Sequence, residues 1–574
     1  MIDKILRNLI RLGLVGIYPM ILILCFILIW CKEKYRNIIK ENYKKIAVIT
    51  IIFMVLLLVG MAIYFSVEDT IYVYDYAGHW KRALIVRDLF LKDPLNVLPR
   101  VYDSMLYDDY SLLPGLFQII PLIFGTSYSY FSITSVVLFL TPSIALFQIL
   151  YLSYFEGKLF SLSLAIISFF PIYINSFYGK IDVVGLFFVF MCVGLIILPE
   201  FEEIDFVDNL SMNLFGFLMI FLRRWYLYSL VGLYIAYFIK YLVYIKFTLN
   251  KENFKKFIKI LFSGILLLVV ILAYFYPFFS MVINNNYSEA YEIYDRSGKF
   301  IELINFYSVV IFSIFVYGLY KSYREKKNIE IIYLFSTISI ISIFLFWGVQ
   351  SMEYHHYNMI NGFLLFFYAY GIENLINQNL YAKLAVSIVL LFQVVNVFLY
   401  NGLNVPFFTN VKKIPEIRGD KQDIVDFSNY LKEITTNKGE FAYLASSTYY
   451  FNDDLLRNAI LPDLRSPEII TAVFDLRDGF PKNLQYVKYI ITIDPILYTD
   501  KDYQHIYDII TNALLSEGKV KELYRISKEL NISGLNITIY EKIGEWSQEV
   551  KEYFYEEMLR YYPDKEDFFA YILD

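Results

Sequence analysis

Long apolar runs constrain this sequence more than any other feature. A helix needs roughly 20 apolar residues to cross about 30 Å of hydrocarbon. About twelve runs approach that length, and they lie near residues 12–31, 46–66, 131–153, 159–176, 181–198, 209–222, 225–245, 259–279, 303–320, 329–349, 358–372 and 380–400. The chain is 58% hydrophobic, well above the usual share in soluble domains. We therefore expect an α-helical polytopic membrane protein.

The distribution of loop cations predicts the orientation. Segments 32–45, 246–258 and 321–328 are rich in Lys and Arg, and with about twelve spans all three fall on one side of the membrane. Cytoplasmic loops carry the excess of positive charge, so we take that side as the cytoplasm. The long first loop, 67–130, and the tail after about residue 402 are then extracytoplasmic, and the chain is expected to be a multi-pass protein of the cell membrane.

The composition changes after the last apolar run. Charges of both signs return, with acidic residues in excess, and a tail of this length can bury its own core. We expect a transmembrane domain at 1–402 and an extracytoplasmic α/β domain at 403–574. Strands are predicted at FAYLASS and YVKYIITI, a hairpin at LYRISKEL and LNITIYEKI, and helices near 421–434, 502–517 and 545–560.

The stretch VYDYAGHWKRAL follows the second apolar run. A helix over residues 74–91 would place Asp75, His79 and Arg82 on one face and Trp80 on another. One interpretation is an interfacial amphipathic helix, with Trp80 at headgroup depth and the charges merely solvated. The other interpretation is part of an active site.

Acidic residues are concentrated in this first outer loop, namely Glu68, Asp69, Asp75, Asp103, Asp108 and Asp109. An anionic lipid surface would repel such an arrangement, whereas a reaction that removes a proton from a hydroxyl requires a carboxylate. The acidic residues therefore favour the active-site interpretation. The loop ends in the apolar stretch 112–125, which is too short to cross and is expected to be a helix lying in the outer interface.

Cations stand at the outer ends of several apolar runs. Arg223 and Arg224 lie between two runs, and an unpaired arginine within the bilayer costs at least about 2.5–3.5 kcal/mol, so a phosphate partner is expected. The alternative is snorkelling to outer headgroups. Lys180 stands beside Asp182, where it would bind the same phosphate or form only an ion pair. Arg82 is a further candidate from the outer loop.

The outer segment SMEYHHYNMIN at 351–361 contains Glu353, His355, His356 and Tyr357. Adjacent histidines point apart and suit one metal poorly, and the three cysteines form no metal-type cluster, so no cofactor or metal is predicted. A lid over a donor phosphate, or hydrogen bonding to an acceptor, is favoured. A polar turn without a role is the remaining alternative.

Several of these stretches together resemble the GT-C superfamily of membrane glycosyltransferases, in the branch of the protein O-mannosyltransferases and lipid A aminoarabinose transferases. The matching stretches are YDYAGHW at 74–80, DSMLYDDYSLLPGL at 103–116, YGKIDVVGL at 178–186 and LRRWYLY at 222–228, with DPILY at 494–498 as a weaker match. Their order and the predicted topology carry the resemblance over nearly the whole chain.

The resemblance implies a GT-C fold and an enzyme that moves a sugar from a polyprenyl phosphate to an acceptor hydroxyl of an envelope glycan, lipid or protein, with inversion. Asp75 matches the catalytic base, whereas the family's usual acidic pair would fall on Glu68 and Asp69. The donor-phosphate ligands would be Arg223, Arg224, Lys180 and Arg82. The substrate contacts would be His79, Trp80, Asp108, Asp109, Glu353, His355, His356 and Tyr357.

Two other classes of protein also have many spans. A transporter or flippase of lipid-linked sugars or envelope glycans would show internal repeats and polar or broken helices at mid-membrane. A receptor or assembly factor led by the tail would not need acids and arginines near one membrane surface. The sequence shows no repeat, and its ionisable residues gather at the outer boundary of the apolar runs. This distribution favours interfacial chemistry.

Overall fold

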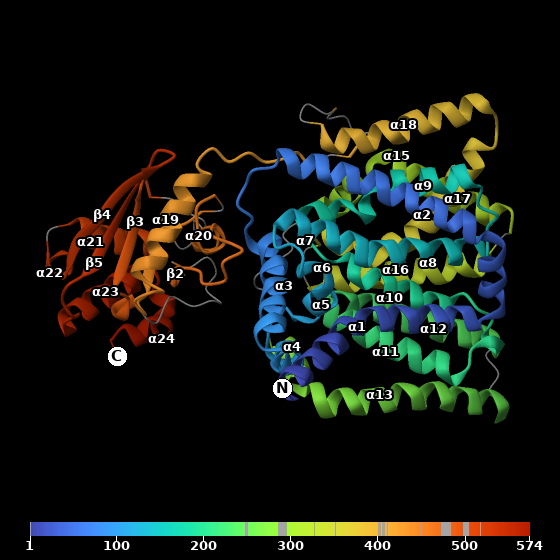
Figure 1. Ribbon diagram of the computed structural model, residues 1–574, viewed down its shortest axis with the longest axis horizontal. Helices are drawn as coiled ribbons and strands as arrows, with labels where there is room; N and C mark the ends of the chain where they lie inside the picture. Colours follow the sequence, from blue (N-terminus) through green and yellow to red (C-terminus); the bar gives the residue numbers. More distant parts are fainter. Residues whose placement is uncertain are drawn as a thin grey trace. The chain divides into compact units, whose positions relative to one another are not determined.

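The computed structural model describes residues 2–573 apart from 109, 247–250, 285–295, 327, 350–351, 400–402, 404–407, 410, 449, 472–483, 497–503 and 517. The chain divides into two compact units (Figure 1). The membrane unit comprises Met1–Ser66 and Arg82–Pro415, and the tail unit comprises Val67–Lys81 and Glu416–Asp574. The tail unit resumes at Glu416, whereas the predicted boundary lies at residue 403. It also includes Val67–Lys81, the start of the first outer loop, which was predicted to belong to the transmembrane domain.

The membrane unit is helical, and nine helices within its described residues are long and apolar enough to cross a membrane. They are α1 (Ile2–Cys31), α2 (Glu33–Val67), α7 (Tyr128–Ser135) continuing into α8 (Thr141–Leu152), α12 (Tyr226–Tyr244), α13 (Lys251–Asn284), α15 (Arg296–Arg324), α16 (Ile329–Val349), α17 (Asn358–Ile376) and α18 (Leu380–Phe398). This architecture is that of a polytopic helical membrane protein.

The other three predicted runs are helical but do not form long straight spans. Helix α9 (Leu159–Ser168) and the segment Phe170–Tyr178 form a pair bent by 58°. Helices α10 (Val183–Cys192) and α11 (Phe206–Leu222) are shorter apolar helices. All twelve runs thus fall on helix, but in the described residues only nine, or ten with the bent pair, have the length of a span.

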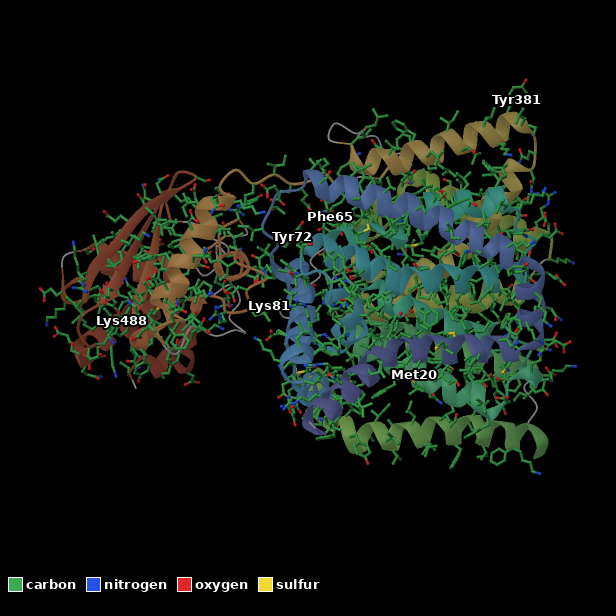
Figure 2. The ribbon with its side chains drawn as sticks, in the orientation of Figure 1. Met20, Phe65, Tyr72, Lys81, Tyr381 and Lys488 are labelled. Atoms are coloured by element: carbon green, nitrogen blue, oxygen red, sulfur yellow. The ribbon has the colours of Figure 1, made fainter. Side chains whose placement is uncertain are left out.

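The helices differ in how much of their surface is covered. Every side chain of α10 is buried, and most of α17 is buried as well. Helices α13 and α18 lie at opposite edges of the membrane unit (Figure 1), and side chains such as Tyr381 on α18 project away from it (Figure 2). Apolar side chains that would be costly to expose to water are well placed to contact lipid.

The first outer loop is folded into helices. The predicted helix at 74–91 is confirmed as α3 (Tyr74–Lys92), which α4 (Val97–Tyr107) follows. The single interfacial helix predicted at 112–125 is wrong, because two short helices, α5 (Leu113–Phe117) and α6 (Ile119–Leu122), occupy this stretch. Gln118 separates them, and most of their side chains are buried. These two helices therefore pack mainly against other parts of the chain.

The tail unit is built on one five-stranded sheet with the order β2-β1-β3-β5-β4. The strands are β1 (Ala442–Leu444), β2 (Ile469–Thr471), β3 (Tyr489–Asp494), β4 (Tyr524–Ile532) and β5 (Leu535–Lys542). Strands β1, β2 and β3 are parallel, and β5 runs antiparallel to β3 and β4. The predicted strands and the hairpin are confirmed, whereas β2 was not predicted.

Alternating residues of these strands belong to two separate hydrophobic clusters. Ile490 packs in one hydrophobic cluster with α21 (Gln504–Leu515) and α23 (Gln548–Tyr561). Its neighbour Ile491 packs in the other with α19 (Lys421–Ile434) and α20 (Asp453–Asn458). The predicted helices correspond to α19, α21 and α23, while α20 and the short α22 (Lys519–Glu522) and α24 (Glu566–Phe569) were not predicted.

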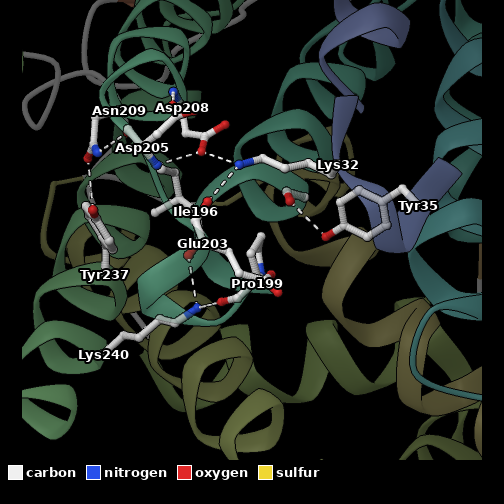
Figure 3. A network of polar contacts seen from close by, with 11 residues as sticks. Lys32, Tyr35, Ile196, Pro199, Glu203, Asp205, Asp208, Asn209, Tyr237 and Lys240 are labelled. Atoms are coloured by element: carbon white, nitrogen blue, oxygen red, sulfur yellow. Dashed lines mark hydrogen bonds and ion pairs between the residues drawn. The ribbon is translucent and has the colours of Figure 1, made fainter. Parts of the chain in front are cut away.

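A buried lysine organises one end of the membrane unit (Figure 3). Lys240, only 5% exposed, donates hydrogen bonds to the carbonyl oxygens of Ile196 at 3.2 Å, Ile197 at 2.9 Å and Pro199. The last carbonyls of a helix have no partner within the helix. Because these carbonyls end the helical segment that continues α10, the lysine serves as their cap.

A second lysine belongs to the same network of polar contacts (Figure 3). Lys32, between α1 and α2, pairs with Asp208 and donates to the carbonyl oxygen of Glu203 at 3.0 Å. Asp208 also accepts the main-chain N–H of Asp205 at 2.9 Å in a reciprocal capping box that starts α11. The network therefore links the α1–α2 junction to the segment between α10 and α11.

We expect Lys240→Met to destabilise the membrane unit by about 1.5–3 kcal/mol, because methionine keeps the apolar stem but leaves the carbonyls without a charged donor. The measurement is the thermal unfolding midpoint of the full chain in detergent. Lys44→Met, at an exposed position on α2, is the control and should leave the midpoint nearly unchanged. Equal midpoints for the two variants would show that Lys240 does not serve as a cap.

Candidate functional site

The turn Arg223–Arg224–Trp225 joins α11 to α12 at the end of the membrane unit opposite the Lys240 network. Helix α12 has 19 residues, with the arginines directly before its first turn and Lys240 near its last turn. At 1.5 Å per residue, the helix separates the two ends by roughly 28 Å. The two polar clusters are therefore distinct.

A buried ion pair fixes this turn. Nε of Arg223 donates to Oδ1 of Asp182 at 2.8 Å, and the two side chains are 1% and 2% exposed. The Tyr226 hydroxyl donates to the main-chain carbonyl of Asp182 at 2.7 Å. A Cβ added at Gly185 would lie 2.2 Å from the Tyr226 ring, so glycine is required for this approach. The stretches YGKIDVVGL and LRRWYLY therefore pack as one body.

Three arginines converge on one tyrosine ring. The guanidinium carbons of Arg82, Arg223 and Arg224 lie 4.7, 5.3 and 5.2 Å from the ring centroid of Tyr110. These distances are within the range of cation–π attraction. Arg82 comes from α3 and the other two from the α11–α12 turn, so Tyr110 brings together cations that lie far apart in the sequence.

The fourth expected cation reaches the same cluster through the two histidines. Nζ of Lys180 lies 2.9 Å from Nδ1 of His355. The rings of His355 and His356 are 3.9 Å apart, and the ring of His356 is 4.7 Å from that of Trp225. The guanidinium of Arg224 lies 5.2 Å from the Trp225 ring. A continuous set of contacts thus joins Lys180 to the arginines.

Buried hydrogen-bond donors accompany these cations. The main-chain N–H of Glu353 donates to Nδ1 of His356 at 2.9 Å, so in the neutral ring Nε2 carries the proton. His356 is 6% exposed, and its Nε2 has no hydrogen-bond partner within the described residues. The same holds for Nε1 of Trp225, whose ring contacts that of His356. A ligand with several acceptor oxygens would satisfy donors that cost about 1–3 kcal/mol each when unpaired.

Other predicted residues of the membrane unit have surroundings of a different kind. Tyr357 is buried with its ring 5.1 Å from that of Phe306 and 5.9 Å from that of Tyr307, as part of the core. Asp108 pairs with Arg100 at 3.0 Å on the surface. Glu353 is exposed, and its contact with His356 is a reciprocal cap. Asp109 lies outside the described residues.

The remaining predicted residues belong to the tail unit, namely Glu68, Asp69, Asp75, His79 and Trp80. The Tyr72 hydroxyl donates to Glu68 at 2.5 Å, and Lys421 donates to Asp69 at 2.5 Å. Asp75 is half-buried in the first turn of α3. His79 and Trp80 are both buried, which does not fit a helix whose polar face is simply solvated.

The site residues that the sequence analysis does not predict are Tyr110 and Trp225. Tyr110 directly follows two predicted acids, and Trp225 directly follows Arg224. Adjacency was the only available signal, because no local pattern pairs Tyr110 with arginines on distant elements.

Comparison of the chain with family models, with curated proteins and with solved structures finds no match. The side-chain arrangement and the resemblance to the GT-C superfamily therefore remain as the grounds for a function.

We expect Asp182→Asn to destabilise the membrane unit by about 3–5 kcal/mol, because it places the buried Arg223 guanidinium beside an uncharged amide. Asp108→Asn breaks an exposed pair and is the control, with an expected cost of about 0–1 kcal/mol. Thermal unfolding of the full chain in detergent measures both. A variant at Asp182 as stable as the one at Asp108 would contradict the structural importance of the buried pair.

Proposed function

We propose that the chain is an integral-membrane glycosyltransferase that moves a sugar from a polyprenyl-phosphate donor to an acceptor hydroxyl on the extracytoplasmic face. The observation that carries this proposal is the convergence of Arg82, Arg223 and Arg224 on Tyr110. The GT-C resemblance supplies the reaction type.

The cations suit the phosphate of a lipid-linked donor. As the bond between the sugar and the phosphate breaks, negative charge increases on the phosphate oxygens, and fixed cations stabilise that charge. Arginine binds phosphate through two parallel donors. The Asp182 pair holds Arg223 in place, so Arg223 contributes mainly by fixing the turn that carries Arg224. Arg82, Arg224 and Lys180 are then the main phosphate ligands.

The neutral donors extend the same site. Nε2 of His356 and Nε1 of Trp225 can donate hydrogen bonds to a ligand without adding charge. Donors of this kind suit the remaining phosphate oxygens or the sugar hydroxyls. In this arrangement the cations attract the phosphate and the neutral donors orient it.

Asp75 is the proposed base. The acceptor oxygen attacks the anomeric carbon while its proton passes to the Asp75 carboxylate. The bond from that carbon to the phosphate oxygen breaks, and its electron pair leaves with the phosphate. Asp69 is less suitable for this role because Lys421 and the neighbouring main chain bind it.

The distribution of charge along the bundle supports the proposed orientation. Lys32 begins the basic segment 32–45 and belongs to the polar network opposite the arginine turn. The positive-inside trend assigns that network to the cytoplasm. The arginine turn is then at the outer surface of the membrane.

We expect Arg82→Gln and Arg224→Gln each to weaken binding of a polyprenyl phosphate by about tenfold or more, because each removes a charged donor. A change at Arg223 is unsuitable, since it would also disrupt the buried pair. Lys92→Gln, on the same helix as Arg82 and exposed, is the matched control. Titration of the purified protein in detergent measures the affinity. Equal affinity in all variants would indicate that the arginines anchor the chain to lipid headgroups instead of binding the donor.

We expect Asp75→Asn to lower turnover by roughly 10²–10⁴-fold, because an amide has the same shape as the carboxylate but cannot accept the proton. The affinity for the donor should stay nearly unchanged. Release of sugar from a panel of polyprenyl-phosphate sugars measures turnover. Asp69→Asn is the control and should have a milder effect. An inactive Asp69→Asn with a normal Asp75→Asn would move the base to Asp69. Tight lipid binding without sugar release by the unaltered protein would favour a flippase.

A further inference from the structure

The start of the first outer loop is built into the tail unit. The main-chain N–H of Asp69 donates to the carbonyl oxygen of Glu416, and the N–H of Arg418 donates to the carbonyl oxygen of Asp69, both at 2.8 Å. Ile71 is buried in the hydrophobic cluster that α19 and α20 cover. Residues before α3 therefore complete the fold of a domain whose other residues come more than 300 positions later.

Tyr74, the first residue of α3, has an unusual backbone conformation. Its φ is +53°, in the left-handed region that few residues other than glycine adopt. Its main-chain N–H donates to the Asp454 carboxylate, and its hydroxyl accepts from Nδ2 of Asn452 at 2.9 Å. A strained residue persists only where its surroundings hold it, and such residues cluster at functional sites.

The residues that hold Tyr74 are themselves fixed. Asn452 is buried, and its Oδ1 accepts the main-chain N–H of Leu455 at 2.8 Å as the cap of α20. Its Nδ2 also donates to the carbonyl oxygen of Thr448 at 2.9 Å. Asn452, fixed as the cap of α20, and Asp454, in the first turn of that helix, therefore clamp the residue that precedes Asp75.

We propose that Asn452 and Asp454 are positioning residues for Asp75. This inference rests on the proposed function, in which Asp75 is the base. Fixing the backbone of Tyr74 fixes the direction in which α3 starts, and Asp75 is in its first turn. The tail unit then contributes to turnover by holding the base, in addition to any contact with the acceptor.

Hydrogen exchange of the full chain in detergent tests the clamp without an activity assay. Asn452→Ala and Asp454→Ala should each speed exchange of the amides at residues 74–78 by about tenfold or more. Asp453→Ala is the matched control, because Asp453 pairs with Arg457 at 3.0 Å. It should leave these amides unchanged. Unchanged exchange in the first two variants, or equal change in all three, would overturn the proposal.

Steady-state kinetics separate positioning from acceptor binding. With a polyprenyl-phosphate sugar as donor, Asn452→Ala and Asp454→Ala should lower kcat with KM for the acceptor unchanged. Asp454→Asn keeps an oxygen that accepts the Tyr74 N–H, so it should retain most of the activity. A rise in KM alone would instead make the tail unit an acceptor-binding module.

The two proposals can fail separately. Faster exchange in the clamp variants together with a fully active Asp75→Asn would retain the clamp and reject the base. An inactive Asp75→Asn together with unchanged exchange would retain the base and reject the clamp.

Discussion

The buried ion pair between Asp182 and Arg223 is the interaction on which the polar end of the membrane unit depends. A charge this deeply buried is tolerated only with a partner and good hydrogen-bond geometry. The pair therefore joins α10 and the α11–α12 turn, and the Tyr226 hydroxyl strengthens the same contact. Because the turn is fixed, Arg224 and Trp225 are presented in one orientation. Such pre-organisation lowers the cost of ordering side chains when a ligand binds.

The two polar ends of the bundle use cations for different purposes. Lys240 donates to three main-chain carbonyls, and Lys32 pairs with Asp208, so both contribute to the fold. The arginines at the other end stack on an aromatic ring next to buried donors without protein partners in the described residues. A cation that caps a helix needs no ligand. Donors that lack an acceptor in the folded chain are the better indication of a binding site.

Much of the fold could be predicted because apolar length and periodicity are local properties. The twelve runs, α3, α19 and the β4–β5 hairpin follow directly from such patterns. The bend after α9 and the break at Gln118 could not be predicted, because they depend on packing against distant helices. The same difference between local and distant contacts applies to the candidate site. Arg223 and Lys180 were identified from their own unusual positions, whereas Tyr110 acquires its importance only from contacts with three distant arginines.

The division of the chain into two units also depends on contacts between residues far apart in the sequence, such as Asp69 and Arg418. The sequence makes Glu68, Asp69 and Asp75 alternative candidates for the base, and the structure gives them different surroundings. Asp69 is held by Lys421 and by main-chain pairing, whereas Asp75 begins a helix whose first residue is strained. The Asp69 carboxylate thus already has a partner within the fold of the tail unit. The strained Tyr74 beside Asp75 is held by Asn452 and Asp454, and strained residues concentrate at functional sites. This position supports the proposal that Asp75, rather than Asp69, is the base.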